Sequence, residues 1–229
     1  MSTTRTALLD LIATLSFKLG DFTLASGQKS DYYIDCRTTT LHAEGGRLAG
    51  LVFYDLIRDH IPHALAVGGL TMGADPLVSN TASASAWALA DHNEILALTD
   101  ELDLTDPSGI DPDPGPAPTL IHGFLVRKAE KAHGTGRRIE GFLQPGAPIV
   151  IVDDVCTTGG STITAIEAAR DAGMTVAGVL CLVDRLQGGR ENIERVLAEG
   201  PPTRDTDPTP AFHAIFTHHD VRQAHLALK

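Results

Sequence analysis

Apolar residues along this chain follow two spacings, one typical of helices and one typical of buried strands. Helical spacing is clearest within residues 5–17, and the same pattern predicts four further helices, at 44–59, 76–90, 161–172 and 189–199. Short apolar or aromatic runs predict strands, at 32–34, 64–67, 120–126, 149–152, 176–183 and 211–216. Because helices and strands alternate, we expect an α/β fold with a largely parallel sheet flanked by helices.

Polar and glycine-rich stretches separate these elements. Gly68 and Gly69 predict a tight loop after one strand, and a polar loop is expected at 127–141. Residues 98–118 differ from the other connections, since they hold five of the 13 prolines and six acidic residues without a clear period. We therefore expect one domain over residues 1–229, with 98–118 as an exposed, mobile insertion.

Negative charge is concentrated in and just before this insertion. The 229-residue chain has a formal net charge of −11, with 29 acidic against 18 basic residues. Eight of the acids and no lysine or arginine lie between Asp91 and Pro118, so 21 acids face 18 bases elsewhere. A nucleic-acid-binding surface is normally basic. The composition therefore argues against nucleic acid as a partner.

Cysteine usage and hydropathy indicate where the protein resides. The three cysteines, Cys36, Cys156 and Cys181, are scattered, which argues against a disulfide framework or a structural zinc site. His218 and His219 are adjacent at an expected helix start and would point in different directions, so no metal site is expected there. No apolar run reaches the roughly 18–20 residues of a membrane span, and no signal-peptide pattern is present. We expect a cytoplasmic protein that does not contact a membrane.

The strongest chemical signal lies at residues 149–162. An apolar strand is followed by Asp153 and Asp154, and a turn rich in threonine and glycine then opens a helix. Backbone N–H groups of such a turn form an anion site, and hydroxyls can add donors there, at Thr157, Thr158, Ser161 and Thr162. Carboxylates beside a phosphate cradle suit sugar hydroxyls or hydrated Mg²⁺. The pattern predicts a site for a phosphorylated ligand at the carboxyl edge of the sheet.

This segment resembles the signature with which type I phosphoribosyltransferases bind 5-phosphoribosyl-1-diphosphate (PRPP). The resemblance implies that Asp153 and Asp154 hold the ribose hydroxyls and that the turn holds the 5-phosphate. It implies a type I phosphoribosyltransferase fold. The implied PRPP-binding residues of this segment are Asp153, Asp154, Val155, Cys156, Thr157, Thr158, Gly159, Gly160 and Ser161.

Three further segments are similar to the orotate phosphoribosyltransferase family. Residues 22–33 read FTLASGQKSDYY and resemble the family's N-terminal segment, which implies a hood, here residues 1–40, over the base. The implied orotate-binding residues are Lys29, Tyr32, Tyr33, Thr157 and Arg185. Arg185 follows a buried strand, and its planar guanidinium suits a bidentate contact with the carboxylate of orotate.

A cationic loop is the second similar segment. Residues 127–134 read RKAEKAHG and match the family's catalytic loop. Such a loop suits a departing pyrophosphate, whose negative charge grows in the transition state. The resemblance implies a homodimer with shared active sites, because this loop reaches the neighbouring subunit. The implied catalytic residues are Arg127, Lys128, Lys131 and His133 of this loop, together with Asp154. The four loop residues are also implied to bind PRPP, as Asp154 is.

The third segment, 67–76, resembles the family's pyrophosphate-side loop. Some members carry lysines at the positions of Ala25 and Gly73, and neither lysine is present here. The consequence for the site stays open, although Lys29 lies near Ala25 in sequence and is one candidate substitute.

Together these resemblances imply a Mg²⁺-dependent enzyme of pyrimidine biosynthesis that makes orotidine 5′-phosphate and pyrophosphate from orotate and PRPP. Mg²⁺ would be held mainly by PRPP, without strong direct ligation by the protein. Two alternatives share the PRPP turn. A phosphoribosyltransferase for a purine base should lack the segments at 22–33 and 127–134. A non-catalytic PRPP-binding regulator that binds nucleic acid would normally show a basic face.

Overall fold

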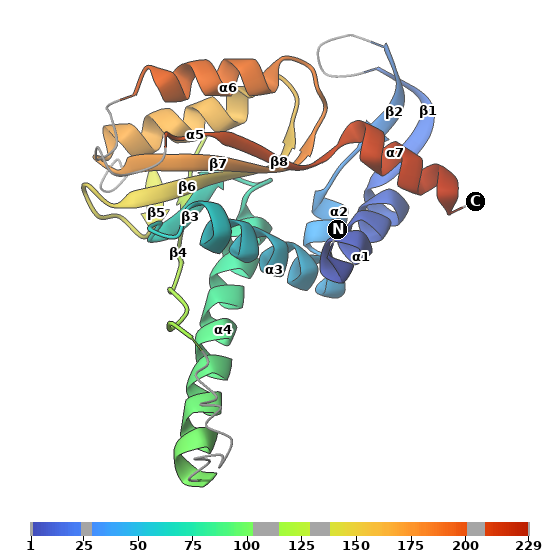
Figure 1. The fold of residues 1–229 in the computed structure, drawn as a ribbon. Coiled ribbons are helices and arrows are strands. Elements are labelled where there is room, and N and C mark those ends of the chain that lie inside the picture. The colour runs from blue at the N-terminus through green and yellow to red at the C-terminus, as the bar shows by residue number, and fades with distance from the viewer. Residues whose placement is uncertain (1, 24–28, 103–114, 129–137, 201–208, 229) are drawn as a thin grey trace.

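The computed structural model consists of a six-stranded sheet covered by helices on both faces, with a small antiparallel ribbon beside it (Figure 1). It describes residues 2–23, 29–102, 115–128, 138–200 and 209–228, without the side chains of 99–102. The helices are α1 (Thr3–Leu11), the π-helical turn Ile12–Ser16, α2 (Arg37–Thr40), α3 (Ala43–His60), α4 (Asp75–Leu102), α5 (Gly160–Asp171), α6 (Gly189–Ala198) and α7 (His218–Ala227). The strands are β1 (Phe17–Thr23), β2 (Lys29–Ile34), β3 (Ala66–Leu70), β4 (His122–Val126), β5 (Ile139–Gly141), β6 (Pro148–Cys156), β7 (Thr175–Asp184) and β8 (Phe212–Thr217).

The order of strands in the large sheet places a crevice at its centre. The order is β5-β4-β3-β6-β7-β8, and all neighbours are parallel except β4 and β5. From β3 the chain adds β4 on one side, and from β6 it adds β7 and then β8 on the other. In open α/β sheets a ligand binds beyond the carboxyl ends of the strands where this order reverses. That point lies between β3 and β6, and the expected α/β fold with a largely parallel sheet is confirmed.

The apolar run at the centre of β6 serves both faces of the sheet. Ile149 and Ile151 pack with Ile166 of α5, on the side that also contains α6. Val150 and Val152 belong to the opposite cluster, which includes residues of α3 and α4. A strand covered on both faces is continuously apolar rather than alternating, which is why the sequence pattern identified it.

Helix α4 is longer than the sequence pattern predicts. The expected helix at 76–90 runs from Asp75 to Leu102, so the expectation that an irregular insertion starts at residue 98 is wrong for residues 98–102. The chain has neither glycine nor proline between Pro76 and Pro107, and this composition sustains a helix even where it leaves the core. The far half of α4 projects from the body of the molecule (Figure 1). Residues 103–114 lie outside the described ranges.

The N-terminal segment forms a lobe beside the sheet together with the C-terminal helix. β1 and β2 pair as an antiparallel ribbon, and α7 lies close to them (Figure 1). Arg222 of α7 forms an ion pair with Asp31 at 2.7 Å, and the ring of His225 hydrogen-bonds the Ala13 carbonyl at 2.8 Å. The helix expected over 5–17 ends earlier, because Phe17 already begins β1.

Parts of two expected loops are strands instead. Gly68 and Gly69 lie within β3, and a Cβ at Gly68 would come within 2.4 Å of the Phe124 ring on β4. The glycine therefore allows close approach of neighbouring strands and does not mark a turn. The end of the expected 127–141 loop forms β5. Even α4, the longest helix of the described ranges, lacks the sustained apolar stretch that a membrane span requires, and no other described helix has one.

Candidate active site

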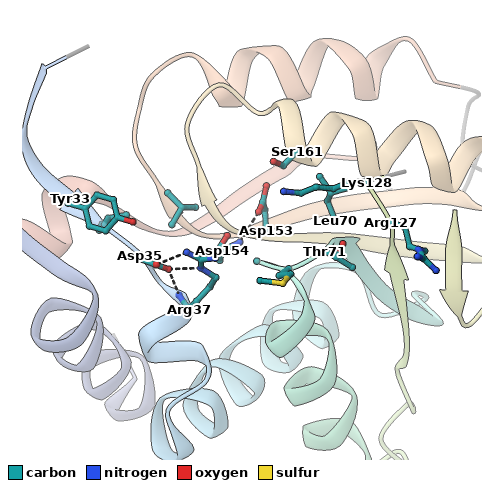
Figure 2. A pocket seen from close by; sticks show the side chains of 14 residues that line it. Tyr33, Asp35, Arg37, Leu70, Thr71, Arg127, Lys128, Asp153, Asp154 and Ser161 are labelled. Carbon is teal, nitrogen blue, oxygen red and sulfur yellow. Dashed lines mark hydrogen bonds and ion pairs between the residues drawn. The ribbon is translucent and has the colours of Figure 1, made fainter. Parts of the chain in front are cut away.

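A cavity of about 720 Å³ opens at the carboxyl ends of β3 and β6 (Figure 2), within the size range of small-molecule sites. Residues from five separate segments meet there: Tyr33, Ile34, Asp35, Arg37, Leu70, Thr71, Met72, Gly73, Arg127, Lys128, Asp153, Asp154, Val155 and Ser161. The cavity thus brings together the two predicted ribose carboxylates, one residue of the predicted phosphate turn and two predicted loop cations.

Asp153 is the most constrained of these groups. Its side chain is only 8% exposed, its Oδ2 accepts a 2.7 Å hydrogen bond from Thr162 Oγ1, and its Oδ1 accepts a 3.0 Å bond from the Asp154 amide. Burial, followed by repulsion from Asp154, raises the pKa of Asp153 to about 7. Both acids lie within β6 and not after it, and the Thr162 hydroxyl, expected to donate to a phosphate, donates to Asp153 instead.

We expect Asp153→Asn to stabilise the ligand-free protein, and to do so more at pH 8 than at pH 5. A carboxyl whose folded-state pKa is raised holds its proton more tightly in the folded state. The free energy of unfolding of the wild type therefore falls as pH rises from about 4 to about 7, and the amide avoids this loss. The gain at pH 8 should be roughly 1–3 kcal/mol, or several degrees in Tm, measured by thermal unfolding. A gain that does not depend on pH would contradict the assignment.

Asp154 faces the loop that follows β3. Burial raises the pKa of Asp154; the charge of Asp35 adds to this effect and the charge of Arg37 opposes it. A Cβ on Gly73 would lie 2.4 Å from Asp154 Oδ1. Any side chain at position 73 would therefore displace this carboxylate, and the glycine is what allows the loop and Asp154 to meet.

The turn predicted to bind phosphate is present, and residues of α6 contact it. Gly159 precedes α5 with a φ of +82°, and no side chain in the described ranges caps this helix. A Cβ on Gly159 would lie 3.0 Å from the carbonyl oxygen of Gly189, and Asn192 Nδ2 donates to the carbonyl of Thr158 at 3.0 Å. The first N–H groups of α5 have no helical acceptor, so the turn offers donors to an anion.

Arg127 and Lys128 lie where β4 ends, on the side of the cavity near β5. The Arg127 amide donates to the Arg138 carbonyl at 2.8 Å, and the Arg127 side chain lies 3.3 Å from a carboxylate oxygen of Glu140. β5 therefore brings the two ends of the predicted cationic loop together. Lys131 and His133, the other predicted cations, lie outside the described residues.

Sequence reasoning missed one charged pair in this cavity. Arg37 donates from Nε to Asp35 Oδ1 at 2.8 Å and from Nη2 to Asp35 Oδ2 at 2.7 Å, which is a bidentate ion pair (Figure 2). A carboxylate and a guanidinium two residues apart after an aromatic strand is a visible signal, but a surface ion pair has the same pattern.

Arg185 is buried and is not among the residues that line the cavity. It is 8% exposed, its Nε donates to the Tyr32 hydroxyl at 3.2 Å, and its guanidinium carbon lies 4.9 Å from the centre of the Tyr32 ring. Its Nη2 has no hydrogen-bond partner among the described residues. A buried guanidinium with an unused donor is suited to receive an anionic group.

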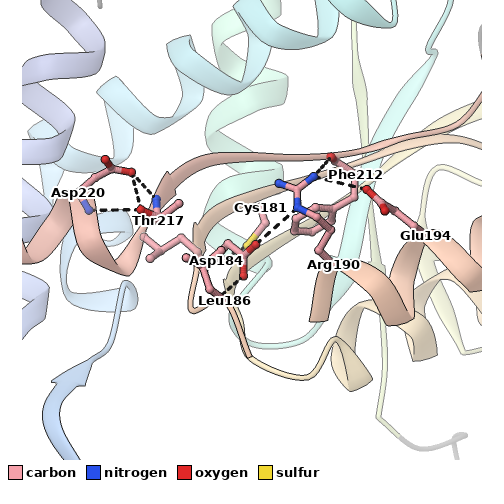
Figure 3. Close-up of polar contacts among 9 residues, drawn as sticks. Cys181, Asp184, Leu186, Arg190, Glu194, Phe212, Thr217 and Asp220 are labelled. Carbon is pink, nitrogen blue, oxygen red and sulfur yellow. Dashed lines mark hydrogen bonds and ion pairs between the residues drawn. The ribbon is translucent and has the colours of Figure 1, made fainter. Parts of the chain in front are cut away.

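Hydrogen bonds in the turn after β7 fix the backbone on both sides of Arg185, and Figure 3 shows the contact between its two neighbours, Asp184 and Leu186. Asp184 is fully buried, and its Oδ1 accepts a 2.8 Å bond from the amide of Leu186, whose φ is +56°. Arg190 Nε lies 3.9 Å from Asp184 Oδ2, and the Arg185 amide donates to the Cys156 carbonyl at 2.9 Å. These contacts connect Arg185 to β6 directly beside the phosphate turn.

The remaining predicted base-side residues are placed differently from one another. Tyr33 lines the cavity, whereas Tyr32 is 6% exposed and its ring stacks with the rings of Phe17 and His218. Thr157 lies outside the cavity lining. Lys29 donates to Thr23 Oγ1 at 2.9 Å and borders a separate hollow beside the ribbon. Direct contacts of Tyr32, Thr157 and Lys29 with a ligand stay predictions.

Comparisons with known proteins agree with this geometry. A family model described as "Phosphoribosyl transferase domain" matches residues 130–198. An orotate phosphoribosyltransferase from Rhodopirellula baltica is 38% identical over 188 residues, which is 80% of this chain and 82% of the relative. The structure of Mycobacterium tuberculosis orotate phosphoribosyltransferase with Fe(III) dicitrate is similar with a TM-score of 0.68 and 32% identity, covering 95% of this chain and 98% of that one. The structure of the same enzyme in complex with PRPP is similar with a TM-score of 0.63 and 27% identity, and the match covers 96% of this chain and 93% of that one.

Proposed function

Because the chain belongs to the orotate phosphoribosyltransferase family, we propose that it transfers the 5-phosphoribosyl group of PRPP to orotate. The products are orotidine 5′-phosphate and pyrophosphate, and the reaction belongs to pyrimidine biosynthesis. The observation that carries the proposal is the meeting, in one cavity, of Asp153 and Asp154 with Ser161 of the phosphate turn and with Arg127 and Lys128.

Each part of PRPP has a chemically suited partner in this cavity. The turn at 157–161 offers backbone N–H groups to the 5-phosphate at the start of α5. Asp154 offers carboxylate oxygens to the ribose hydroxyls. Each oxygen of Asp153 accepts one hydrogen bond within the protein and keeps a second lone pair for a ribose hydroxyl. Arg127 and Lys128 face the remaining space, where the pyrophosphate would lie, and Lys131 and His133 complete this loop in the proposal.

The chemical task of the site is electrostatic. Negative charge grows on pyrophosphate as its bond to the ribose breaks, and cations placed in advance stabilise that charge. Orotate is itself anionic, so its ring nitrogen needs no strong general base. Arg185 would pair with the orotate carboxylate through the donor that it leaves unused within the protein. Exclusion of water protects PRPP from hydrolysis during this step.

Mg²⁺ is part of the proposal, and the donor set suits it. Mg²⁺ prefers oxygen ligands and keeps several waters, and the cavity presents carboxylates at Asp35, Asp153 and Asp154. The described residues contain no cluster of three or more side chains that would hold a metal by themselves. In the proposal PRPP supplies most of the ligands of the ion, Asp154 would contribute a carboxylate oxygen, and the ion would neutralise charge on the pyrophosphate.

A direct assay tests the function. With Mg²⁺ and PRPP present, we expect orotate to be consumed and orotidine 5′-phosphate to appear in equal amounts, followed by absorbance and by chromatography. Adenine, guanine and hypoxanthine replace orotate in parallel reactions. Consumption of a purine base and not of orotate would overturn the proposal, as would PRPP binding without transfer to any base.

We also propose a homodimer in which the 127–136 loop of each subunit serves the PRPP site of the other. Lys131→Ala and Asp154→Asn should then each be nearly inactive as homodimers. Random exchange of equal amounts makes half of the dimers mixed, and each mixed dimer has one intact site. We expect roughly a quarter of wild-type activity to return after mixing. No recovery, although native mass spectrometry shows exchange, would place the loop in its own subunit's site.

A further inference from the structure

The cations that face the cavity lie on two sides of it. Arg127 and Lys128 come from the end of β4, and Arg37 comes from the start of α2, on the other side of Asp154 (Figure 2). Among the described residues these three are the only lysines or arginines in the lining. Arg127 and Lys128 have a role in the proposed transfer reaction, whereas Arg37 has none yet.

Arg37 is oriented by Asp35 and still has donors to offer. Asp35 accepts from Nε and Nη2, which uses two of the five guanidinium N–H groups. The other three have no partner among the described residues, and the side chain is 44% exposed toward solvent and the cavity. The bidentate contact holds the plane of the guanidinium in place, so the free edge is already positioned for a ligand.

The loop after β3 supplies no cation of its own on this side. Its residues at the cavity are Thr71, Met72 and Gly73, and a side chain at position 73 would collide with Asp154. Arg37 borders the same region, because it also lines a neighbouring groove together with Met72 and Asp75. Among the described residues, the positive group that borders the space beside this loop therefore comes from α2.

We propose that Arg37 binds the pyrophosphate group of PRPP from the side opposite Arg127 and Lys128, and that Asp35 is the positioning residue that holds it. The inference rests on the proposed function in that PRPP is the ligand. Ser161, at the start of α5, lies away from Arg37 in Figure 2, which separates this contact from the one proposed for the 5-phosphate. A pyrophosphate carries several negative charges, and a guanidinium fork matches two phosphate oxygens at once.

Calorimetric binding of three ligands in Mg²⁺ buffer tests the contact. We expect Arg37→Gln to raise the Kd for PRPP and for inorganic pyrophosphate by roughly 10- to 100-fold, which is the size expected for a lost charge-assisted hydrogen bond. Ribose 5-phosphate, which lacks pyrophosphate, should change by less than about twofold. Arg37→Lys keeps the charge without the fork and should recover only part of the affinity.

Arg47→Gln is the matched control. Arg47 forms the same bidentate contact with Glu44, at 2.8 and 2.7 Å, its side chain is 46% exposed, and it lies outside the cavity lining. It should leave all three affinities unchanged. The proposal is wrong if Arg37→Gln and Arg47→Gln change the three affinities equally. It is also wrong if Arg37→Gln weakens the binding of ribose 5-phosphate as much as the binding of pyrophosphate.

The role of Asp35 is tested by a double-mutant cycle. Asp35→Asn should weaken the binding of pyrophosphate by a smaller factor than Arg37→Gln does. The double variant should lose no more affinity for pyrophosphate than Arg37→Gln alone. Additive losses would mean that Asp35 does not act through Arg37.

Transfer to orotate is measured separately, so that failure of the proposed function can be told apart from failure of this contact. A wild type that binds PRPP but does not consume orotate would overturn the proposed function and leave the Arg37 contact unaffected. A wild type that binds neither PRPP nor pyrophosphate would overturn both.

Discussion

Replacing Asp154 by asparagine should lower kcat/KM for PRPP by roughly 100-fold and leave the fold intact. The amide has nearly the same shape and retains one oxygen, but it loses the negative charge that would hold ribose hydroxyls and the hydrated Mg²⁺ beside them. A 100-fold loss corresponds to about 2.7 kcal/mol of transition-state stabilisation. Initial rates at varied PRPP and saturating orotate measure it.

Asp55→Asn is the control for this prediction. Asp55 is also a carboxyl whose pKa burial raises, but it lies on α3 and does not line the cavity. It should keep wild-type kinetics. Thermal unfolding of both variants checks that neither has lost its structure. If Asp154→Asn retained near wild-type kcat/KM, the carboxylate would have no part in binding PRPP, and the assignment of the cavity would have to change.

Replacing Arg185 by alanine should raise the KM for orotate by roughly 100-fold and change the KM for PRPP by less than about threefold. Removing one partner of a buried, charged hydrogen bond usually costs a few kcal/mol. Arg185→Lys should rescue poorly, because a point charge reproduces neither the fork nor the contact with the face of Tyr32. Steady-state kinetics with each substrate varied in turn provide the measurement.

Arg190→Ala is the matched control for Arg185→Ala. Like Arg185, Arg190 lies outside the cavity lining and over an aromatic ring, with its guanidinium carbon 4.8 Å from the centre of Phe212. It differs in that its side chain is 39% exposed and its Nη1 already donates to the Phe212 carbonyl. Equal increases in KM for both substrates after Arg185→Ala would indicate a structural role instead. A change in orotate KM of the same size after Arg190→Ala would indicate that the whole β7 turn, and not Arg185 itself, governs the base side.

The local part of the site was predictable from sequence. The segment 149–162 combines a strand that is apolar on both faces, two acids and a glycine-containing turn before a helix. All of these are neighbours along the chain. Periodicity reports burial within one element, and turn chemistry reports the next few residues, so the β6–α5 unit was identified with its phosphate turn. The alternation of helices and strands likewise indicated the parallel sheet.

The contacts between distant segments were decided by the tertiary structure. Asp35 and Arg37 become cavity residues only because the N-terminal lobe packs against the large sheet and brings the segment after β2 close to Asp154. Tyr32 likewise meets Arg185 across 153 residues. The reason for Gly73 becomes visible only where Asp154 approaches it. The far end of α4 follows from the absence of a helix breaker and not from an apolar stripe.

The sequence by itself therefore determined the fold class and the glycine-containing turn between β6 and α5 with two acids before it, because these depend on residues close together in the chain. Tertiary structure alone decided which charges share the cavity, which oxygens of Asp153 are already engaged, and that Arg185 is held by Tyr32. Such contacts between distant residues depend on the order of strands and on the packing of whole elements, and the spacing of residues along the chain predicts neither.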